Sequence, residues 1–151
     1  MNDDAIVDTL NELIEMSKDA EYGFRTSAQF LEAAETRTLF EGRADECQRA
    51  AAELQALVPQ YGGKAHDSGS TGGAVHRGWV AVKATLAGYN DKSILEETEQ
   101  GVDDALASYT KALALTLPPD LRAVVEHQCE ETQANHTLVR FLRDQARVAS
   151  L

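Results

Sequence analysis

Four long stretches of this chain carry apolar residues every three or four positions, and this spacing constrains the fold more than any other feature. In the first stretch, Leu10, Leu13 and Ile14 are followed at helical spacing by Phe24 and Leu31. Such a period places the apolar side chains on one face of an α-helix. The sequence has no alternating apolar and polar run and no Asn-Gly or Asp-Gly hairpin signal. It therefore predicts an all-α protein.

Residues that start or stop helices set the expected bounds of the first two helices. The first helix is expected over residues 4–35. A capping-box pattern from Thr38 to Glu41 then restarts the chain as the second helix. Pro59 and Gly62-Gly63 are expected to end it.

Similar signals bound the last two long helices. Ser93 begins another capping box, and the helix it starts is expected to continue to about residue 117. Pro118-Pro119 makes a sharp stop and restart, because proline cannot continue a helix but fits its first turn. The last helix is expected over residues 119–149.

The connection between the second and third helices is long. It consists of a glycine-rich loop over residues 62–73 and a short helical pattern over residues 74–87. A connection of this length can cross a bundle, whereas short loops give a simple up-and-down order. We therefore expect one domain over residues 1–151, a four-helix bundle whose long crossover carries a short extra helix between helices 2 and 3.

The formal net charge of −11 limits the partners. Nucleic acid and anionic lipid attract basic faces, so we expect the chain to bind neither. It has no run of about 18 apolar residues that would predict a membrane span. The start, Met1-Asn2-Asp3-Asp4, lacks the basic and apolar segments of a signal peptide. Cys47 and Cys129 are far apart and match no metal or redox spacing, which suggests a reducing compartment, so the chain is expected to be cytoplasmic and of bacterial type.

Polar residues interrupt the apolar stripes near the middle of three helices. Glu21 falls within the stripe of the first helix, about 20° from Leu10 in helical projection. Other members of this expected layer are Thr98, Gln128, Thr132 and Asn135 on the stripes and Glu99, Glu131 and His136 at their edges. A buried carboxylate is costly unless it is paired, protonated or bound to a metal. The pattern therefore indicates either a metal site or a buried hydrogen-bond network.

Three segments carry a resemblance to known proteins. They are residues 19–24 (Asp-Ala-Glu-Tyr-Gly-Phe), residues 76–79 (His-Arg-Gly-Trp) and residues 101–109 with 111–113. Through them, nearly the whole chain resembles an uncharacterised bacterial four-helix-bundle family of the ferritin-like group. The resemblance implies a ferritin-like bundle. It also implies iron or another divalent metal, because ferritin-like iron proteins supply a Glu from two helices and Glu-x-x-His from the other two.

The chain departs from that iron-binding pattern on two helices. The nearest match on the second helix is Glu46-x-x-Arg49, where a guanidinium that cannot bind metal replaces the imidazole. The nearest match on the last helix is Gln133-x-x-His136, where an amide replaces the carboxylate. A standard two-iron site is therefore not expected to be intact.

The expected levels of the carboxylates along the bundle also disagree. With a turn near Arg37, Glu21 lies opposite Glu53, and Glu46 lies about 10 Å nearer the turn. The sequence then favours a single-ion or altered metal site drawn from five residues: Glu21, Glu53, Glu99, Glu131 and His136.

Three functions stay open on the sequence alone. The first is a ferritin-like cytosolic protein, stress- or metal-related, with a degenerate rather than intact di-iron site. The second is a structural or interaction module without metal that dimerises through a helix face, for which Ala33, Ala34 and Phe141 are the evidence. The third, ranked last, is a metal-carboxylate oxidase with rearranged ligands. We expect a homo-oligomer, a dimer in the simplest case, and favour a role without catalysis.

Overall fold

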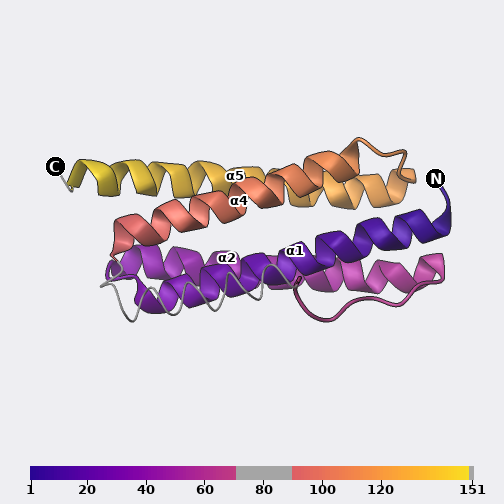
Figure 1. The fold of residues 1–151 in the computed structure, drawn as a ribbon, viewed down its shortest axis with the longest axis horizontal. Coiled ribbons are helices and arrows are strands. Elements are labelled where there is room, and N and C mark those ends of the chain that lie inside the picture. The colour runs from indigo at the N-terminus through magenta and orange to yellow at the C-terminus, as the bar shows by residue number, and fades with distance from the viewer. Residues whose placement is uncertain (71–89, 150–151) are drawn as a thin grey trace.

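The computed structural model describes residues 1–70 and 90–149, and within these ranges all regular structure is helical. The elements are α1 (Asp3–Phe30), α2 (Ala34–Leu57), the 3-10 helix η1 (Val58–Tyr61), α4 (Asp91–Leu113) and α5 (Pro119–Ala149). Two antiparallel hairpins, α1–α2 and α4–α5, lie side by side (Figure 1). This confirms the all-α four-helix bundle, whereas the short helix expected over residues 74–87 lies outside the described residues. None of the helices in the described ranges combines the length and apolar character that a bilayer crossing requires.

The first hairpin turns earlier than expected. α1 ends at Phe30 and α2 begins at Ala34, so the helix expected over residues 4–35 and its restart at Thr38 are both wrong. Thr38 lies inside α2, where its hydroxyl donates to the Ala34 carbonyl at 3.2 Å. A capping-box pattern can therefore lie within a helix when tertiary contacts fix the turn elsewhere.

Contacts from the neighbouring hairpin hold this turn. Leu31 has an extended backbone and a side chain that is only 2% exposed. The Asp91 carboxylate of α4 accepts hydrogen bonds from the backbone N–H groups of Glu32 and Ala33 at 2.8 and 3.1 Å. Burial of a leucine contributes about 1.5–3 kcal/mol, which outweighs a weak local preference for continuing the helix.

The second hairpin also differs slightly from expectation. Asn90 caps α4, since its Oδ1 accepts from the Ser93 N–H at 2.9 Å, and the helix thus begins at Asp91, before the expected Ser93. It ends at Leu113 and not near residue 117. Leu117 instead lies in the connection, buried against the core. α5 begins at Pro119 as expected.

α2 and η1 end at one end of the bundle, and α4 begins at the other (Figure 1). Gly62 ends η1 at a φ of 77°, in the left-handed region that glycine adopts without strain. Buried Asn11 of α1 then holds the start of the connection. Its Nδ2 donates to the Lys64 carbonyl at 3.1 Å, and its Oδ1 accepts from the His66 N–H at 2.9 Å.

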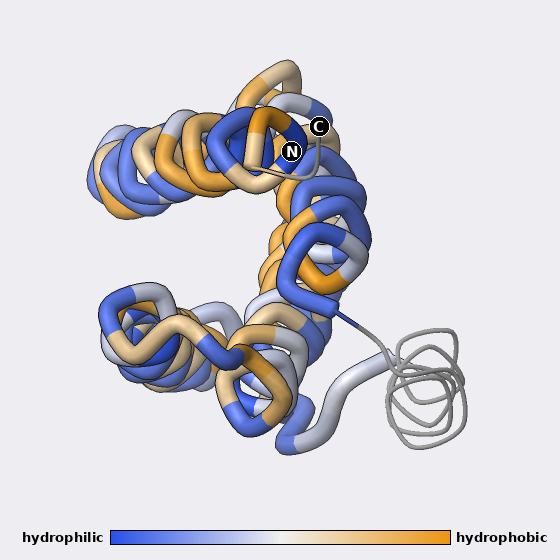
Figure 2. Tube along the Cα trace, turned by 90° about the vertical axis from the view of Figure 1, so that its left-hand side faces the viewer, coloured by the Kyte–Doolittle hydropathy of each residue, from blue (hydrophilic) through white to orange (hydrophobic). Residues whose placement is uncertain are grey.

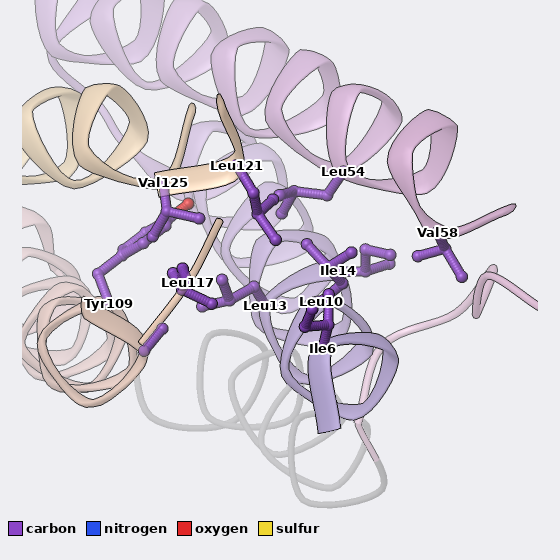
Figure 3. Close-up of a cluster of buried hydrophobic side chains, with 11 residues drawn as sticks. Ile6, Leu10, Leu13, Ile14, Leu54, Val58, Tyr109, Leu117, Leu121 and Val125 are labelled. Atoms are coloured by element: carbon purple, nitrogen blue, oxygen red, sulfur yellow. The ribbon is translucent and has the colours of Figure 1, made fainter. Parts of the chain in front are cut away.

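Two apolar clusters fill the interior at different heights along the bundle. The first, drawn in Figure 3, includes Leu13, Leu54 and Val125. The second includes Phe24 and Phe40, whose rings pack edge to face with centroids 5.2 Å apart. Apolar burial therefore stabilises both ends of the bundle. Between the two clusters, polar side chains make the contacts that join the helices.

The helices are not equally close to one another. Seen along their axes in Figure 2, they follow an open arc. α1 packs closely on α2, α4 on α5 and α1 on α4, whereas α2 and α5 approach each other much less. Side chains that join α2 to α5 consequently have to be long, and at mid-height they are polar.

Candidate functional site

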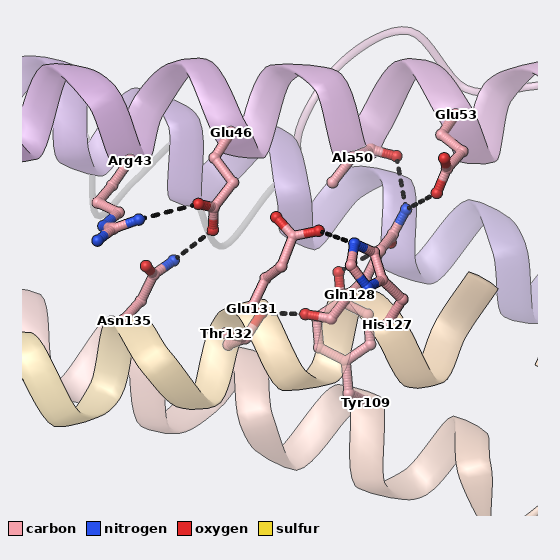
Figure 4. Close-up of polar contacts among 10 residues, drawn as sticks. All are labelled: Arg43, Glu46, Ala50, Glu53, Tyr109, His127, Gln128, Glu131, Thr132 and Asn135. Carbon is pink, nitrogen blue, oxygen red and sulfur yellow. Dashed lines mark hydrogen bonds and ion pairs between the residues drawn. The ribbon is translucent and has the colours of Figure 1, made fainter. Parts of the chain in front are cut away.

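Polar side chains of α2 and α5 face each other between the two apolar clusters (Figure 4). Gln128 of α5 is only 3% exposed. Its Oε1 accepts from the Tyr109 hydroxyl of α4 at 3.0 Å, and its Nε2 donates to the Ala50 carbonyl at 3.2 Å and to Glu53 Oε1 at 2.9 Å. One amide thus joins three helices. We use the name middle layer for the following residues: Ser17, Arg43, Glu46, Glu53, Tyr109, His127, Gln128, Glu131 and Asn135.

Asn135, two turns further along α5, forms a second bridge to α2. Its Nδ2 donates to Glu46 Oε1 at 3.1 Å, and the other oxygen of Glu46 accepts from Arg43 Nη1 at 3.0 Å. Arg43 and Glu46 are one turn apart on α2, so this ion pair does not cross between helices. The hydrogen bonds that join α5 to α2 are therefore donated by side-chain amides of α5 and accepted by carboxylates or a backbone carbonyl of α2.

Glu131 points from α5 toward α2 and lies near Glu46 (Figure 4). Burial first, and then the negative charge of Glu46, raise the pKa of the Glu131 carboxyl. His127 Nε2 lies 2.8 Å from Glu131 Oε1 on the same helix, and a protonated His127 opposes this rise in the pKa of Glu131. Two carboxylates brought together in this way favour a proton or a cation between them.

A cavity of about 30 Å³ lies beside these carboxylates and is lined by all four long helices. That volume accommodates a water-sized occupant. Two buried oxygens of residues on its wall, Ser17 Oγ and Asn135 Oδ1, make no hydrogen bond of normal geometry, although Ser17 approaches the Tyr109 hydroxyl. Because buried polar atoms are nearly always satisfied, the two oxygens indicate a small polar ligand.

Cys47 of α2 also lines this cavity. The charges that act on its thiol show which residues of α1 and α2 lie at the same height along the bundle. Burial raises the pKa of its thiol to about 12, and the charges of Glu46 and Glu21 both add to the rise. Glu21 therefore lies near the level of Glu46. The expected turn near Arg37 is wrong, and with it the expected pairing of Glu21 with Glu53 fails.

The carboxylate of Glu21 is partly buried and paired with an arginine of its own helix, and it does not line the cavity. Glu21 is seven residues from both Ile14 and Ala28, which are buried, but its own side chain is 20% exposed and pairs with Arg25 at 3.2 Å. A long charged side chain can start on a buried stripe and still carry its charge outward. The expectation of a carboxylate inside the stripe is therefore wrong.

Two more of the expected ligands, Glu99 of α4 and His136 of α5, lie where these two helices face each other, away from α2. Glu99 pairs with Arg143, and His136 Nε2 lies 2.6 Å from Asp103 Oδ1. We use the name α4–α5 edge for this row of ion pairs, which also includes Glu96 and Arg147 at 3.4 Å. Each carboxylate of this row has a basic partner on the facing helix.

The structure thus divides the five expected ligands, of which only Glu53 and Glu131 belong to the middle layer. Glu131 lines the cavity, Glu53 binds Gln128, Glu21 binds Arg25, and Glu99 and His136 belong to the α4–α5 edge. Among the described residues, no group of three or more His, Cys, Asp or Glu is arranged to hold a metal ion. A metal site here would have to use amide or hydroxyl oxygens as well.

The two threonines expected in the polar layer bind their own helices. The hydroxyl of Thr98 donates to the Ile94 carbonyl at 2.8 Å, and that of Thr132 donates to the Gln128 carbonyl at 2.9 Å. Such bonds satisfy the hydroxyls locally. Only Thr132 lines the cavity.

The middle layer contains five residues that the sequence did not single out as site residues: Ser17, Arg43, Glu46, Tyr109 and His127. Glu46 was set aside because the assumed turn put it at the wrong level. With the turn at residues 31–33, the same helical arithmetic places it near Glu21. The correct position of the α1–α2 turn was the information needed to include Glu46 in the site.

Comparison with known proteins identifies the fold. A mutant of Dps1 from Mycobacterium smegmatis superposes with a TM-score of 0.75 at 10% sequence identity, covering 93% of this chain and 96% of that one. A dodecameric thioferritin, the bacterioferritin-related protein from Bacteroides fragilis, superposes with a TM-score of 0.77 at 16% identity, covering 99% and 91%. At such identities the likeness shows the ferritin-like fold alone.

Sequence comparison supplies the family. The search of curated proteins gives no match. Residues 5–115 match a family described as a domain of unknown function, DUF2383. That match covers well over half of the chain, and the chain therefore belongs to the DUF2383 family, here with a ferritin-like four-helix fold.

Proposed function

We propose that the protein is a metal-related ferritin-like bundle that binds one divalent cation in the middle layer and has no two-metal oxidase centre. The observation that carries this proposal is the cavity beside Glu46 and Glu131, with the unpartnered oxygens of Ser17 and Asn135 on its wall. Carboxylate, amide and hydroxyl oxygens are ligands of hard cations such as Mg²⁺ and Mn²⁺. The net charge of −11 also attracts cations.

The donor set does not fit a two-iron centre. Iron sites in ferritin-like bundles draw ligating carboxylates from all four helices and histidines from two. Here α1 and α4 give the cavity only uncharged side chains, Phe24 and Val102 among them. Arg43 already neutralises part of the charge of Glu46. We therefore assign no iron-oxidation step to these residues, and the oxidase hypothesis stays last.

A single ion would use the groups that the cavity already assembles. Glu46 and Glu131 would supply negative charge, and Asn135 would supply Oδ1, the oxygen that lacks a partner. Arg43 would keep the outer oxygen of Glu46. This set refines the metal-site prediction: Glu131 is retained, and Glu46 takes the place of the other four predicted ligands.

Manganese binding tests the proposal. We expect the chain to bind one Mn²⁺ in an EPR titration, and we expect Glu131→Gln to weaken binding by about tenfold or more. Glu130→Gln is the matched control, because it removes the same charge from an exposed neighbour. Two ions per chain, or equal binding by the two variants, would contradict the proposal. Rapid oxidation of Fe²⁺ by the wild type would contradict it too.

We also propose that the chain forms a homo-oligomer, because α5 carries exposed apolar side chains. Phe141 and Val148, which are 59% and 69% exposed, lie seven residues apart on one face of α5. The structurally similar thioferritin is dodecameric. Light scattering after size exclusion should give a mass above that of one chain, reduced by Phe141→Glu. A monomer at micromolar concentration would contradict this proposal. The dimer and the cytoplasmic location stay predictions.

A further inference from the structure

We infer that two copies of this chain pair through one end of the α2–α5 side, with the last turns of α5 in each copy lying against the start of α2 in the other. The inference rests on the homo-oligomer proposed above, to which it adds a defined surface and a two-fold arrangement. It does not depend on the proposed cation site, because the residues that carry it lie about two turns or more from Glu46 and Glu131.

An exposed leucine of α2 and an exposed phenylalanine of α5 lie at nearly the same height along the bundle. The hydrogen bond from Asn135 Nδ2 to Glu46 Oε1, 3.1 Å long, fixes the relative levels of these two helices. The helices are antiparallel (Figure 1). Seven residues back along α2 and seven residues on along α5 therefore lead to one level, which places Leu39 opposite residue 142 and beside the level of Phe141.

Both side chains border the side on which α2 and α5 face each other. Leu39 lies seven residues before Glu46, which α2 directs toward α5, so the two share a face of the helix (Figure 4). In the same way, Leu138 lies seven residues after Glu131, which α5 directs toward α2. Phe141 follows Leu138 by three residues, about 60° further toward solvent. Apolar side chains of two helices therefore meet at the margin of one side.

α2 and α5 do not close this side themselves. The open arc of helices in Figure 2 runs in the order α2, α1, α4 and α5, so that α2 and α5 are its two ends. Among the described residues, six large apolar side chains are exposed, and three of them, Leu39, Phe141 and Val148, belong to the start of α2 or the last turns of α5. Exposed apolar side chains gathered in this way mark a contact surface.

The two halves of this surface carry opposite charge. Residues 32–42, the α1–α2 turn and the start of α2, contain three glutamates and one arginine. Residues 138–149 of α5 contain three arginines and one aspartate, in a chain whose formal net charge is −11. Arg143 and Arg147 pair with carboxylates of α4, whereas exposed Arg140 makes no ion pair within the described part of the chain. The end of α5 therefore has positive charge left for a partner whose facing surface is negative.

A second copy of this chain supplies such a surface. A two-fold axis at the height of Leu39 and Phe141 lays the positive end of α5 in each copy along the negative start of α2 in the other. Phe141 then contacts the partner's Leu39, and Arg140 lies near the partner's Glu35, which is exposed in the first turn of α2. Because the arrangement is two-fold, both contacts form twice.

Sedimentation equilibrium of matched variants tests the surface. We expect Leu39→Asp to raise the dissociation constant of the oligomer by about tenfold or more, because it places a charge in the apolar contact. Leu115→Asp is the matched control, since Leu115 is 38% exposed and Leu39 37%, but Leu115 lies in the α4–α5 connection at the other end of the bundle. Circular dichroism checks that both variants keep their helices. Equal dissociation constants for the two variants would overturn the inference.

Disulfide cross-linking tests the same contact without weakening it by a charge. Chains with Leu39→Cys are mixed with chains with Phe141→Cys, all of them carrying Cys129→Ser, and the mixture is oxidised after subunit exchange. We expect covalent dimers in the mixture and few in either variant alone. Gln133→Cys, at an exposed position of α5, replaces Phe141→Cys in the control mixture. If the first mixture cross-links no more than the control mixture, the two-fold arrangement is wrong.

The same measurements separate this inference from the homo-oligomer on which it rests. A monomeric wild type at micromolar concentration would overturn both. An oligomer that Phe141→Glu weakens and Leu39→Asp leaves unchanged would overturn the pairing of α5 with the partner's α2, and the homo-oligomer would stand. Weakening by both variants, together with the cross-link between positions 39 and 141, is the result that we expect.

Discussion

The middle layer and the α4–α5 edge both hold partly buried carboxylates, but the two regions neutralise them differently. At the edge, Glu99 and Asp103 of α4 each find a basic partner on α5. In the middle layer, Glu46 and Glu131 come from facing helices and lie near each other, while Arg43 and His127 lie on the same helix as the carboxylate they pair with. At the edge each carboxylate thus has a basic partner on the facing helix, although Glu99 Oε2 makes no hydrogen bond, whereas in the middle layer the two carboxylates face each other across α2 and α5.

The largest expected contrast concerns solvent access to the middle layer. With a pKa of about 12, the Cys47 thiol has about a thousandfold less thiolate at pH 8 than a thiol of pKa 9. We expect a thiol reagent to label Cys47 far more slowly than Cys129, which burial affects less. Cys129→Ser isolates the slow reaction. Equal labelling rates would mean that the α2–α5 side is open, against the structure.

Removal of a bridging side chain from the middle layer should destabilise the fold most. Gln128→Ala deletes a buried group that binds Tyr109, Ala50 and Glu53, and it leaves a cavity. The expected loss in unfolding free energy is about 2–3 kcal/mol by urea denaturation. Gln133→Ala on the exposed side of α5 should change it by less than about 0.5 kcal/mol. If Gln128→Ala lowered the unfolding free energy by a similarly small amount, the hydrogen bonds of Gln128 would not stabilise the fold.

A break in the α4–α5 edge should cost less. Arg143→Met leaves the carboxylate of Glu99, 17% exposed, without its cation. We expect a lower Tm than for the wild type, but a higher one than for Gln128→Ala. Arg140→Met, at an exposed position on the same helix, controls for the loss of a positive charge. If Arg143→Met melts no lower than this control, the edge ion pairs do not stabilise the fold.

Salt should have the smallest effect, and it should act in opposite directions on the two regions. Screening by 1 M NaCl weakens the attraction between Glu99 and Arg143, so the penalty of Arg143→Met should shrink. Screening also weakens the repulsion between Glu46 and Glu131, so the gain in Tm expected from Glu131→Gln should shrink. Melting curves at low and high salt check both changes. A larger gain from Glu131→Gln in high salt would contradict the repulsion.

Helical periodicity was sufficient to predict the bundle, the start of α5 and the inward positions of Gln128 and Asn135. It could not locate the α1–α2 turn, because Asp91 holds that turn from more than fifty residues away. An error of about five residues in the turn shifts the predicted level of Glu46 relative to Glu21 by about 15 Å along the axis, because every residue of α2 moves by twice that number of positions against α1. Periodicity also places the backbone of Glu21 correctly but says nothing of where a long side chain carries its charge.

A double-mutant cycle between Glu46 and Glu131 measures whether these two carboxylates interact across the α2–α5 side. Each residue is changed to Gln, alone and together, and urea unfolding is measured at pH 8 in EDTA. Because the two carboxylates repel each other, we expect Glu131→Gln to stabilise the fold only while Glu46 is present, with a coupling free energy of at least about 0.5 kcal/mol. Effects of the two single changes that add within about 0.3 kcal/mol would show that Glu46 and Glu131 do not interact, and would contradict a shared site between them.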